Sequence, residues 1–360
     1  MKRARSLAAI FVATALLAGA WITGSSGSAQ ASFPGKTGRI AFDDFYTGQL
    51  YAVNPDGTAL VQLTHEPNGY VATWPDWSPD GSHLLFVRFN LSNGMGRIWI
   101  MRSDGSGQHK LTSDTPGYRD YQPNFTPDGR QIVFPRCKPN DGVCAIWIMR
   151  SDGTNKRALT PYKEGAREAV DFFPSVSPDG TRVAYTAFGQ NGISVQTRVM
   201  RLNGTHNHAI SPPALEASVP DWSPDGKRLT VSSNWARLNN NVYTMRPDGD
   251  DIDQLTFTKY PNNSGGSVYA PGGDRIAFSS DRRYPDLCCL DLFVMNANGT
   301  NQHLVPTGLQ GVVDEVWGTA PLLSRTPSMI AGPPRAAHSP GAARNAPCLR
   351  LPDIVARAMC

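Results

Sequence analysis

Short apolar runs alternate with Asp-Gly turns along most of the chain. Residues 74–81 read Trp-Pro-Asp-Trp-Ser-Pro-Asp-Gly, and they precede apolar runs at 84–87 and 98–101 and a second turn, Ser-Asp-Gly-Ser, at 103–106. Ser-Pro-Asp-Gly is typical of a type I turn, because Pro presets φ, Asp bonds to the local backbone and Gly accepts a positive φ. Asp-Gly between two β-rich runs indicates a hairpin. The stretch therefore predicts four short antiparallel strands.

The same pattern recurs along the chain. The first turn returns with its glycine at positions 129, 180, 226 and 273, in steps of 48, 51, 46 and 47 residues. The second turn has its glycine at Gly57, Gly105, Gly153, Gly204, Gly249 and Gly299. Repeats of about 40–50 residues with four strands each are typical of β-propeller blades. The absence of helical spacing argues against a solenoid.

The two ends of the repeat region complete each other. The first unit has strands at 38–42, 49–53 and 60–64 but lacks the strand that ends in a Pro-Asp-Trp-Ser turn. Residues 313–318, Val-Asp-Glu-Val-Trp-Gly, occupy that position after the sixth unit. An unpaired strand edge invites aggregation, which favours closure. We predict an all-β fold: a six-bladed β-propeller with four-stranded blades, in which a C-terminal strand completes blade 1.

The repeat resembles those of a known family. Pro-x-Trp-Ser-Pro-Asp-Gly, Ile-x-Phe, Ile-Trp-Ile-Met, Asp-Gly-(Ser/Thr) and Leu-Thr follow one another as in the WD40-like (PD40) repeats of TolB propellers, over essentially all of residues 33–320. TolB carries an N-terminal α/β domain before its propeller, whereas Phe33 here enters the first blade almost at once. The resemblance therefore implies a protein-binding propeller, but not a part in the Tol–Pal system. Related propellers gate serine peptidases or form polysaccharide lyases, so the fold alone leaves function open.

The two ends of the chain differ in composition from the repeats. Lys2, Arg3 and Arg5 precede an apolar run at 7–22 and Ala-Gln-Ala at 29–31, the pattern of a secretory signal peptide cleaved before Ser32. A run of 16 residues is short for a membrane span, and the alanine at position 20 replaces the lipidated cysteine of a lipoprotein.

We expect three segments: a signal peptide (1–31), the propeller (32–324) and a disordered Pro/Ala/Arg-rich tail (325–360). The mature protein is then exported (periplasmic, cell-envelope or secreted) and not stably inserted in a membrane.

Charge and cysteine usage agree with export. The chain has a net charge of +4, of which the signal contributes +3 and the tail +4, so the propeller carries about −3. That balance argues against nucleic acid as a partner. Cys137 and Cys144 lie on the two arms of one hairpin in blade 3, within disulfide reach, and outside the cytoplasm we expect them bonded rather than free. The pairing of Cys288, Cys289, Cys348 and Cys360 stays open.

Familiar catalytic motifs are missing. The chain has no Gly-x-Ser-x-Gly, His-Glu-x-x-His, P-loop or dinucleotide fingerprint. His206 and His208 flank Asn207 in a loop without a third ligand, which favours solvated side chains over a metal site. An acidic turn at 248–253 misses the EF-hand spacing, since Ile252 occupies a ligand position. We predict neither a metal nor another cofactor.

Two sets of repeated residues have structural explanations. Asp80, Asp128, Asp179 and Asp225 belong to turns that need Asp for their geometry. Large apolar groups at equivalent positions of the innermost strands are expected to pack between blades, with a sugar-stacking platform as the alternative; they are Trp77, Phe125, Val176, Trp222, Tyr269 and Trp317.

The positions that vary between blades lie just upstream, where each innermost strand begins at the mouth of the central channel. Rigid scaffolds place specificity on such loops. One tier holds Ala72, Asp120, Asp171, Ala217, Ser264 and Val312. We predict a partner-binding site for a polar ligand or peptide end, with solvated loop residues as the alternative; its members are Tyr70, Tyr118, Arg119, Asp120, Tyr121, Glu168, Asp171, Glu216 and Asp314.

Two functions remain open. The first is a monomeric, non-catalytic exported propeller that binds a protein or peptide of the cell envelope at this mouth. The second is an envelope-polymer hydrolase or polysaccharide lyase that uses Asp120, Asp171 and His-bearing loops. Such enzymes need paired carboxylates or a metal-bound His cluster. Binding is favoured, because no nucleophile–base pair is evident in the sequence.

Overall fold

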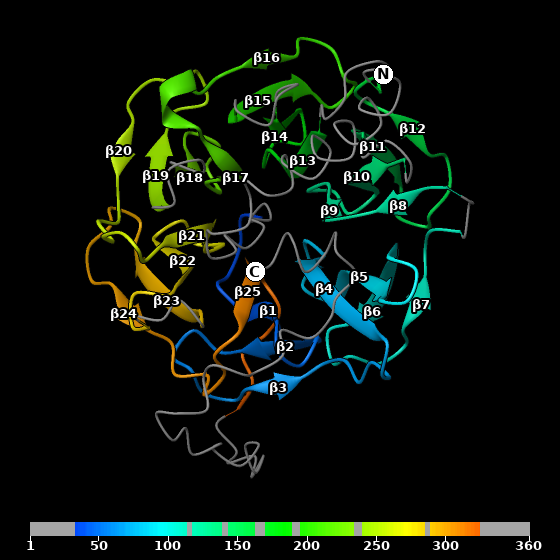
Figure 1. Ribbon diagram of the computed structural model, residues 1–360, viewed down its shortest axis with the longest axis horizontal. Helices are drawn as coiled ribbons and strands as arrows, with labels where there is room; N and C mark the ends of the chain where they lie inside the picture. Colours follow the sequence, from blue (N-terminus) through cyan, green and yellow to red (C-terminus); the bar gives the residue numbers. More distant parts are fainter. Residues whose placement is uncertain are drawn as a thin grey trace, which may run out of the picture.

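The computed structural model describes residues 33–113, 117–138, 143–162, 170–188, 195–233, 240–284 and 289–324. Small antiparallel sheets stand around a central axis, so that the chain runs once around a ring (Figure 1). Within the described residues the regular structure is β-strand, apart from one 3₁₀ turn, η1 (Pro213–Leu215). The predicted signal peptide and tail, together with Glu168, Cys288, Cys348 and Cys360, lie outside the described residues. In the described part no helix is long and apolar enough to cross a membrane.

Each blade is a four-stranded meander with its innermost strand first. Blade 1 consists of β25 (Val312–Trp317), β1 (Ile40–Asp44), β2 (Gln49–Val53) and β3 (Val61–Gln62). Blade 2 consists of β4 (Tyr70–Trp77), β5 (His83–Asn90), β6 (Met95–Arg102) and β7 (His109–Lys110). In blade 3 the innermost strand is divided into β8 (Arg119–Asp120) and β9 (Asn124–Phe125), followed by β10 (Gln131–Cys137), β11 (Cys144–Arg150) and β12 (Arg157–Ala158).

The second half of the ring repeats the arrangement. Blade 4 consists of β13 (Val170–Val176), β14 (Arg182–Phe188), β15 (Val195–Arg201) and β16 (His208–Ala209). Blade 5 consists of β17 (Ser218–Trp222), β18 (Leu229–Ser233), β19 (Asn241–Met245) and β20 (Asp253–Gln254). Blade 6 consists of β21 (Ser264–Tyr269), β22 (Arg275–Ser280), β23 (Asp291–Asn296) and β24 (His303–Leu304). A parallel bridge between Cys144 and Val170 joins blades 3 and 4 into one sheet.

The C-terminal strand closes the ring as predicted. β25 pairs antiparallel with β1, and Trp317 lies opposite Ile40. The sheet order β25-β1-β2-β3 places the last described strand innermost in the first blade. Closure leaves no unpaired seam between the first and last blades, which removes the edge that an open sheet would expose.

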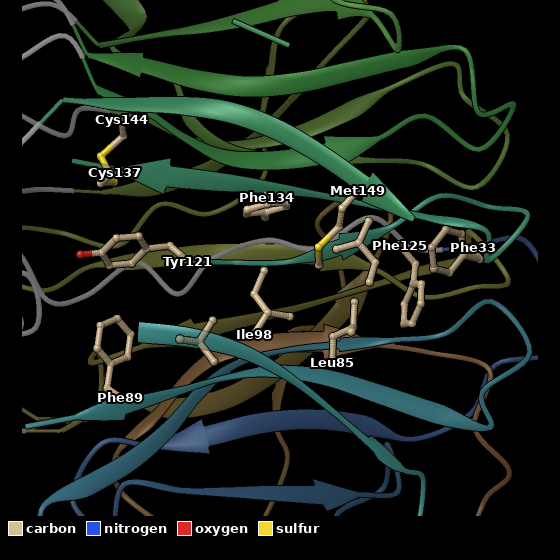
Figure 2. Close-up of a cluster of buried hydrophobic side chains, with 12 residues drawn as sticks. Phe33, Leu85, Phe89, Ile98, Tyr121, Phe125, Phe134, Cys137, Cys144 and Met149 are labelled. Atoms are coloured by element: carbon tan, nitrogen blue, oxygen red, sulfur yellow. A yellow bond between two sulfur atoms is a disulfide. The ribbon is translucent and has the colours of Figure 1, made fainter. Parts of the chain in front are cut away.

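The core lies between the blades. The predicted inter-blade residues Trp77, Phe125, Val176, Trp222, Tyr269 and Trp317 are all buried. Figure 2 shows one such layer, in which Leu85 and Ile98 of blade 2 pack against Phe134 and Met149 of blade 3. This confirms the packing interpretation, because a stacking platform for a sugar would have to be exposed.

Every innermost strand bends at the same place. A residue three positions before the inter-blade side chain has a positive φ: Trp74 (52°), Gln122 (31°), Phe173 (54°), Val219 (52°), Gly266 (63°) and Asp314 (55°). The β4–β5 ladder shifts register there, between Thr73 and Asp76, and four other blades show the same shift. These are β-bulges, and they hold bulky residues in a conformation that normally favours glycine. The repeat pattern alone did not predict them.

Side chains just after the bulge link neighbouring blades. The Asp76 carboxylate accepts the N–H of Phe125 at 2.7 Å, and the Asn124 amide oxygen accepts the N–H of Val176 at 2.9 Å. Asp221 accepts the N–H of Tyr269 in the same way, at 2.8 Å. Burial raises the pKa of Asp76 well above its ordinary value. Part of the polarity near the axis is therefore used to hold the ring together.

The turn carboxylates serve geometry, as predicted. Asp80 accepts the hydroxyl of Ser78 at 2.6 Å and the N–H of Ser82 at 3.0 Å. The bond from Ser78 lowers the pKa of Asp80. Asp128, Asp179 and Asp225 each accept an equivalent pair of bonds.

The predicted disulfide is present in blade 3. Cys137 and Cys144 lie opposite each other in β10 and β11, their Cα atoms are 4.0 Å apart, and their sulfur atoms are bonded. The bond closes the mouth-side end of this hairpin, next to the innermost strand that carries Arg119 and Asp120.

Candidate functional site

All innermost strands begin on one face of the ring, which we call the mouth face. Tyr70 begins β4, Arg119 begins β8, and Val312 begins β25. The predicted site residues that the structure describes therefore share this face, but they differ in how much of each side chain is accessible. Asp120, Tyr121, Asp171 and Asp314 are buried, whereas Tyr70, Tyr118, Arg119 and Glu216 are partly or largely exposed.

Asp120 is part of a buried ion pair. Its two carboxylate oxygens accept Nε and Nη2 of Arg136 at 2.7 and 3.1 Å, and its side chain is 1% exposed. The Arg136 guanidinium also lies over the rings of Phe134 and Trp147. A carboxylate so fully engaged holds the blade together and is not available to a partner without breaking the pair.

Asp314 is also engaged, at the bulge of blade 1. Its carboxylate and that of Asp43 both accept the hydroxyl of Thr73, each at 3.1 Å. Burial, followed by the neighbouring Asp314, raises the pKa of Asp43 well above its ordinary value. Burial and the neighbouring carboxylate therefore favour the protonated form of Asp43. Glu315, the next residue, is fully buried, and burial raises its pKa as well.

Three predicted residues remain accessible around blades 2 and 3. Tyr70 is 38% exposed, and its hydroxyl accepts the Asn90 amide at 3.2 Å. Tyr118 lies 6.4 Å from Tyr162, ring to ring. Arg119 lies beside Tyr121, whose pKa is raised by burial and partly lowered again by the Arg119 charge. Glu216 stands apart, in a left-handed conformation at the end of η1.

An arc of aromatic rings joins blades 2, 3 and 4 at this face. The rings of Phe89 and Trp74 are 5.3 Å apart, those of Trp74 and Tyr121 5.5 Å, and those of Tyr121 and Phe172 5.2 Å. Phe173 continues the arc 5.9 Å from Phe172. Trp74, Phe172 and Phe173 are partly exposed. Trp74 and Phe172 also pack against the core cluster between blades 2 and 3, so part of each ring is buried and part is accessible.

The sequence reasoning missed this aromatic arc. Trp74 and Phe173 occupy the bulge position, and Tyr121 and Phe172 the position before it. The positions one and two residues after the tier of Asp120 and Asp171 carry aromatic residues in blades 2, 3 and 4, and an alignment of the repeats at those positions would have shown them. Blades 5 and 6 carry small residues at the same level, Ser218, Val219, Gly265 and Gly266. The channel wall is therefore aromatic over blades 2, 3 and 4 and acidic at blade 1. The backbone N–H of Trp74 donates to the Asp43 carboxylate of blade 1 at 3.3 Å.

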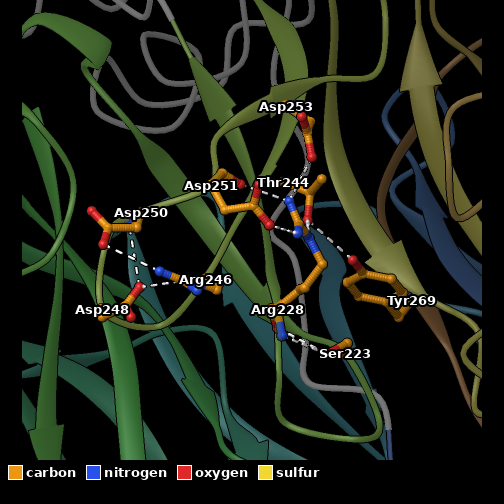
Figure 3. Close-up of polar contacts among 9 residues, drawn as sticks. All are labelled: Ser223, Arg228, Thr244, Arg246, Asp248, Asp250, Asp251, Asp253 and Tyr269. Atoms are coloured by element: carbon orange, nitrogen blue, oxygen red, sulfur yellow. Dashed lines mark hydrogen bonds and ion pairs between the residues drawn. The ribbon is translucent and has the colours of Figure 1, made fainter.

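The other polar candidates are ordinary surface groups. Figure 3 shows the acidic turn: Arg228 pairs with Asp251 and Asp253, and Arg246 pairs with Asp248 and Asp250. These arginines neutralise the carboxylates that a cation would need. The described residues contain no group of three or more His, Cys, Asp or Glu placed to hold a metal ion. His206 and His208 are exposed on the outer edge of blade 4.

Comparison with known proteins agrees with the fold. Residues 143–317 match the family model described as PD40, TolB beta propeller domain. A protein TolB homolog of Chlorobium luteolum is 30% identical over 128 residues, which cover 34% of this chain and 27% of that protein. Dipeptidyl-peptidase 5 of Porphyromonas endodontalis is 28% identical over 119 residues, which cover 31% of this chain and 16% of that protein. The chain thus spans about a quarter or less of the length of these two relatives.

Solved structures show the same architecture. TolB from Acinetobacter baumannii superposes with a TM-score of 0.62 at 18% identity, covering 79% of this chain and 67% of that one. At that identity the likeness concerns the fold alone. The repeat motif, the match of residues 143–317 to the PD40 model and the closed ring of four-stranded blades together support a TolB-like β-propeller family for this chain.

Proposed function

We propose that this chain is a non-catalytic, exported propeller that binds a protein or peptide at its mouth face. The observation that carries the proposal is the partly exposed aromatic arc of Trp74, Phe172 and Phe173. Exposed aromatic rings on a rigid scaffold are favourable contacts for a protein partner, because they bury a large area at little cost in side-chain entropy. Tyr70, Tyr118 and Arg119 extend the same surface over blades 2 and 3.

The carboxylates contribute differently from the aromatic arc. Asp120 and Asp314 are held by Arg136 and by Asp43 with Thr73. Their carboxylate oxygens are buried and already bonded, so Asp120 and Asp314 shape the wall behind the arc and are not available to a ligand. We therefore assign recognition to the aromatic arc with Tyr70, Tyr118 and Arg119, and treat Asp120 and Asp314 as supporting residues.

A hydrolase or lyase receives no comparable support. Acid–base chemistry needs a titrating group within hydrogen-bond reach of the substrate. In the described chain His65 and His206 lie in loops, and His109, His208 and His303 lie on outermost strands. His83 begins β5 at the end of blade 2 opposite the mouth, and Asp120 is neutralised by Arg136. The relatives named as enzymes share the propeller with this chain over a small part of their own length.

The experiment that tests binding uses the full chain as bait in an extract of the cell envelope. Trp74→Asn with Phe173→Asn removes two rings of the aromatic arc, and asparagine tolerates the positive φ at both positions. Ile252→Asn, on the opposite face and 37% exposed, is the matched control. We expect quantitative mass spectrometry to show partners retained by wild type and control but lost from the double variant. Equal recovery on all three proteins would refute the mouth assignment.

The export proposal has its own measurement. Residues 1–31 are proposed to be removed, leaving propeller 32–324 and tail 325–360. Mass spectrometry of the protein isolated from the envelope or medium should then find Ser32 at its N-terminus. A mature protein that retains Met1 would contradict cleavage.

A further inference from the structure

Three arginine guanidinium groups occupy equivalent places in three blades. Each lies over an aromatic ring on at least one of the two middle strands of its blade. The Arg88 group is 4.4 Å from the ring of Trp99, and the Arg136 group is 5.1 Å from that of Trp147. The Arg282 group is 5.1 and 4.8 Å from the rings of Phe278 and Phe293. Phe86–Trp99, Phe134–Trp147 and Phe278–Phe293 are the corresponding strand pairs. Arg88 and Arg136 each follow the first ring of the pair by two residues, whereas Arg282 follows Phe278 by four, so blade 6 brings a cation over the same ring pair from a later position in the chain.

Blades 2 and 3 neutralise this cation internally. Arg88 is paired with Glu66, which lies in the loop leading into blade 2, and Arg136 is paired with Asp120 on the innermost strand. Both carboxylate side chains are 1% exposed. A guanidinium removed from water is costly unless a counter-charge lies beside it, so these pairs are the expected arrangement.

Blade 6 lacks the carboxylate at both positions. Thr258 takes the place that Glu66 has in blade 2. Each lies two residues after a threonine, Thr256 or Thr64, whose hydroxyl oxygen accepts a backbone N–H of the preceding blade. Ser264 takes the place of Asp120 five positions before the inter-blade side chain. The partners of Arg282 are all neutral: Ser280 Oγ at 3.1 Å, Ser264 Oγ at 3.0 Å and Gln302 Oε1 at 2.7 Å. No carboxylate of the described chain lies within salt-bridge distance of it. Burial lowers the pKa of Arg282, and the charge of the neighbouring Asp281 opposes this shift without forming an ion pair.

An open cleft lies beside this guanidinium. Its volume is about 400 Å³, and it is lined by Phe257, Thr258, Lys259, Asn262, Arg282 and Gln302. The lining holds two cations and two amides but no acid. At its edge Phe257 is 74% exposed and Tyr260 66% exposed, the largest exposed fractions among the large hydrophobic side chains described. Both amide groups donate their hydrogens to backbone carbonyls, so the charge of the cleft comes from its two cations. Cations beside exposed rings suit an anionic ligand with apolar neighbours.

We propose that this cleft between blades 5 and 6 binds a carboxylate of an acidic peptide segment. The ligand supplies to Arg282 the counter-charge that Glu66 and Asp120 supply in blades 2 and 3. The exposed rings of Phe257 and Tyr260 receive an apolar side chain next to the acidic one, which favours a peptide over a uniformly polar chain. The inference rests on the proposed protein-binding function and adds a second contact, specific for negative charge.

The test uses the full chain and two short peptides that differ only in charge. The probes are Ac-Phe-Glu-Asp-Phe-amide and the neutral Ac-Phe-Gln-Asn-Phe-amide, titrated by calorimetry at low salt. We expect the acidic peptide to bind at least about tenfold more tightly, and Arg282→Gln to remove that preference. Raising the ionic strength should weaken the acidic peptide selectively.

A variant that supplies the missing carboxylate provides the sharpest control. Thr258→Glu copies the blade 2 arrangement, and its new carboxylate should form an intramolecular ion pair with Arg282. We expect this variant to stay folded and to bind the acidic peptide at least about tenfold more weakly than wild type. Thr258→Gln has the same size without the charge and should bind like wild type. Equal binding by Thr258→Glu and Thr258→Gln would overturn the proposal, as would equal binding of the two peptides.

Two further outcomes separate this inference from the proposed function. An oligogalacturonate that binds more tightly than the acidic peptide, with the same dependence on Arg282, would assign the cleft to acidic polysaccharide and overturn the peptide assignment. Trp74→Asn with Phe173→Asn should leave peptide binding in the cleft unchanged. If the acidic peptide fails to bind while that double variant still loses its envelope partners, the cleft assignment falls and the mouth assignment stands.

Discussion

The indole N–H of Trp317 donates a 3.0 Å hydrogen bond to the backbone carbonyl of Gly38, 279 positions earlier in the chain. A Cβ at Gly38 would lie 2.1 Å from the carbonyl oxygen of Ala320, so the segment that follows β25 passes the segment that precedes β1 too closely for any other residue at position 38. The ring therefore closes through backbone contact as well as through side chains. This closure holds the innermost strands in a circle and so creates a mouth.

Removal of the Trp317 side chain should open this junction. Trp317 is fully buried, and Arg275 lies over its ring at 5.0 Å. We expect Trp317→Ala to lower the free energy of unfolding by about 3–5 kcal/mol, measured by urea denaturation. Leu322→Ala, 51% exposed just beyond the strand, should change it by less than about 0.5 kcal/mol. Similar small losses in both variants would show that closure contributes little to stability.

Asp120→Asn should act on stability before it acts on binding. The substitution leaves the Arg136 guanidinium, 7% exposed, without its counter-charge. We expect a loss of about 3–5 kcal/mol in the free energy of unfolding. Asp251→Asn breaks a pair whose carboxylate is 55% exposed and should cost less than about 1 kcal/mol. A fully stable Asp120→Asn protein that loses its partners would instead restore Asp120 to the recognition surface.

The Asp43–Asp314 pair should make stability depend on pH. The pKa of Asp43 is raised in the folded state, so its contribution is present below the unfolded pKa of about 3.9 and is lost as pH rises through the folded pKa. The asparagine side chain in Asp43→Asn does not titrate. As the pH rises from about 4 to 7, the free energy of unfolding of this variant should therefore fall less than that of wild type. The difference should be ~1.4 kcal/mol for each pH unit by which folding raises the pKa of Asp43.

Asp80→Asn is the control for this titration. The pKa of Asp80 is lowered by its bond from Ser78, so Asp80 contributes stability above its unfolded pKa that is lost on acidification. Its removal should change the pH dependence in the opposite sense. Parallel pH profiles for wild type and Asp43→Asn would show that the pair does not retain a proton.

The Cys137–Cys144 disulfide should stabilise the fold by restricting the unfolded chain. The two residues are separated by 7 positions, so the closed loop is short. The chain-entropy model then gives roughly 2–3 kcal/mol. We expect Cys137→Ser with Cys144→Ser to lose about that amount in urea denaturation. An unchanged midpoint would contradict a stabilising role.

The residue pattern by itself determined the repeat, the closure and the disulfide. Turns such as Ser78-Pro-Asp-Gly81 specify their own geometry locally, and a blade that lacks its first strand must obtain it elsewhere, so Trp317 could be placed beside Ile40 from sequence alone. Cys137 and Cys144 followed from the same hairpin logic.

Only the tertiary structure decided which polar and aromatic groups are accessible. Asp120 and Asp314 lie on the mouth face as expected, yet each is withdrawn from solvent by a partner distant in sequence or on another strand. The bulge at Trp74 and Phe173 presents their rings at the mouth, and Arg282 lacks the acid that other blades provide. Alternation along a strand predicts a local direction, but burial and charge pairing depend on neighbouring blades. Those neighbours meet only when the ring has closed.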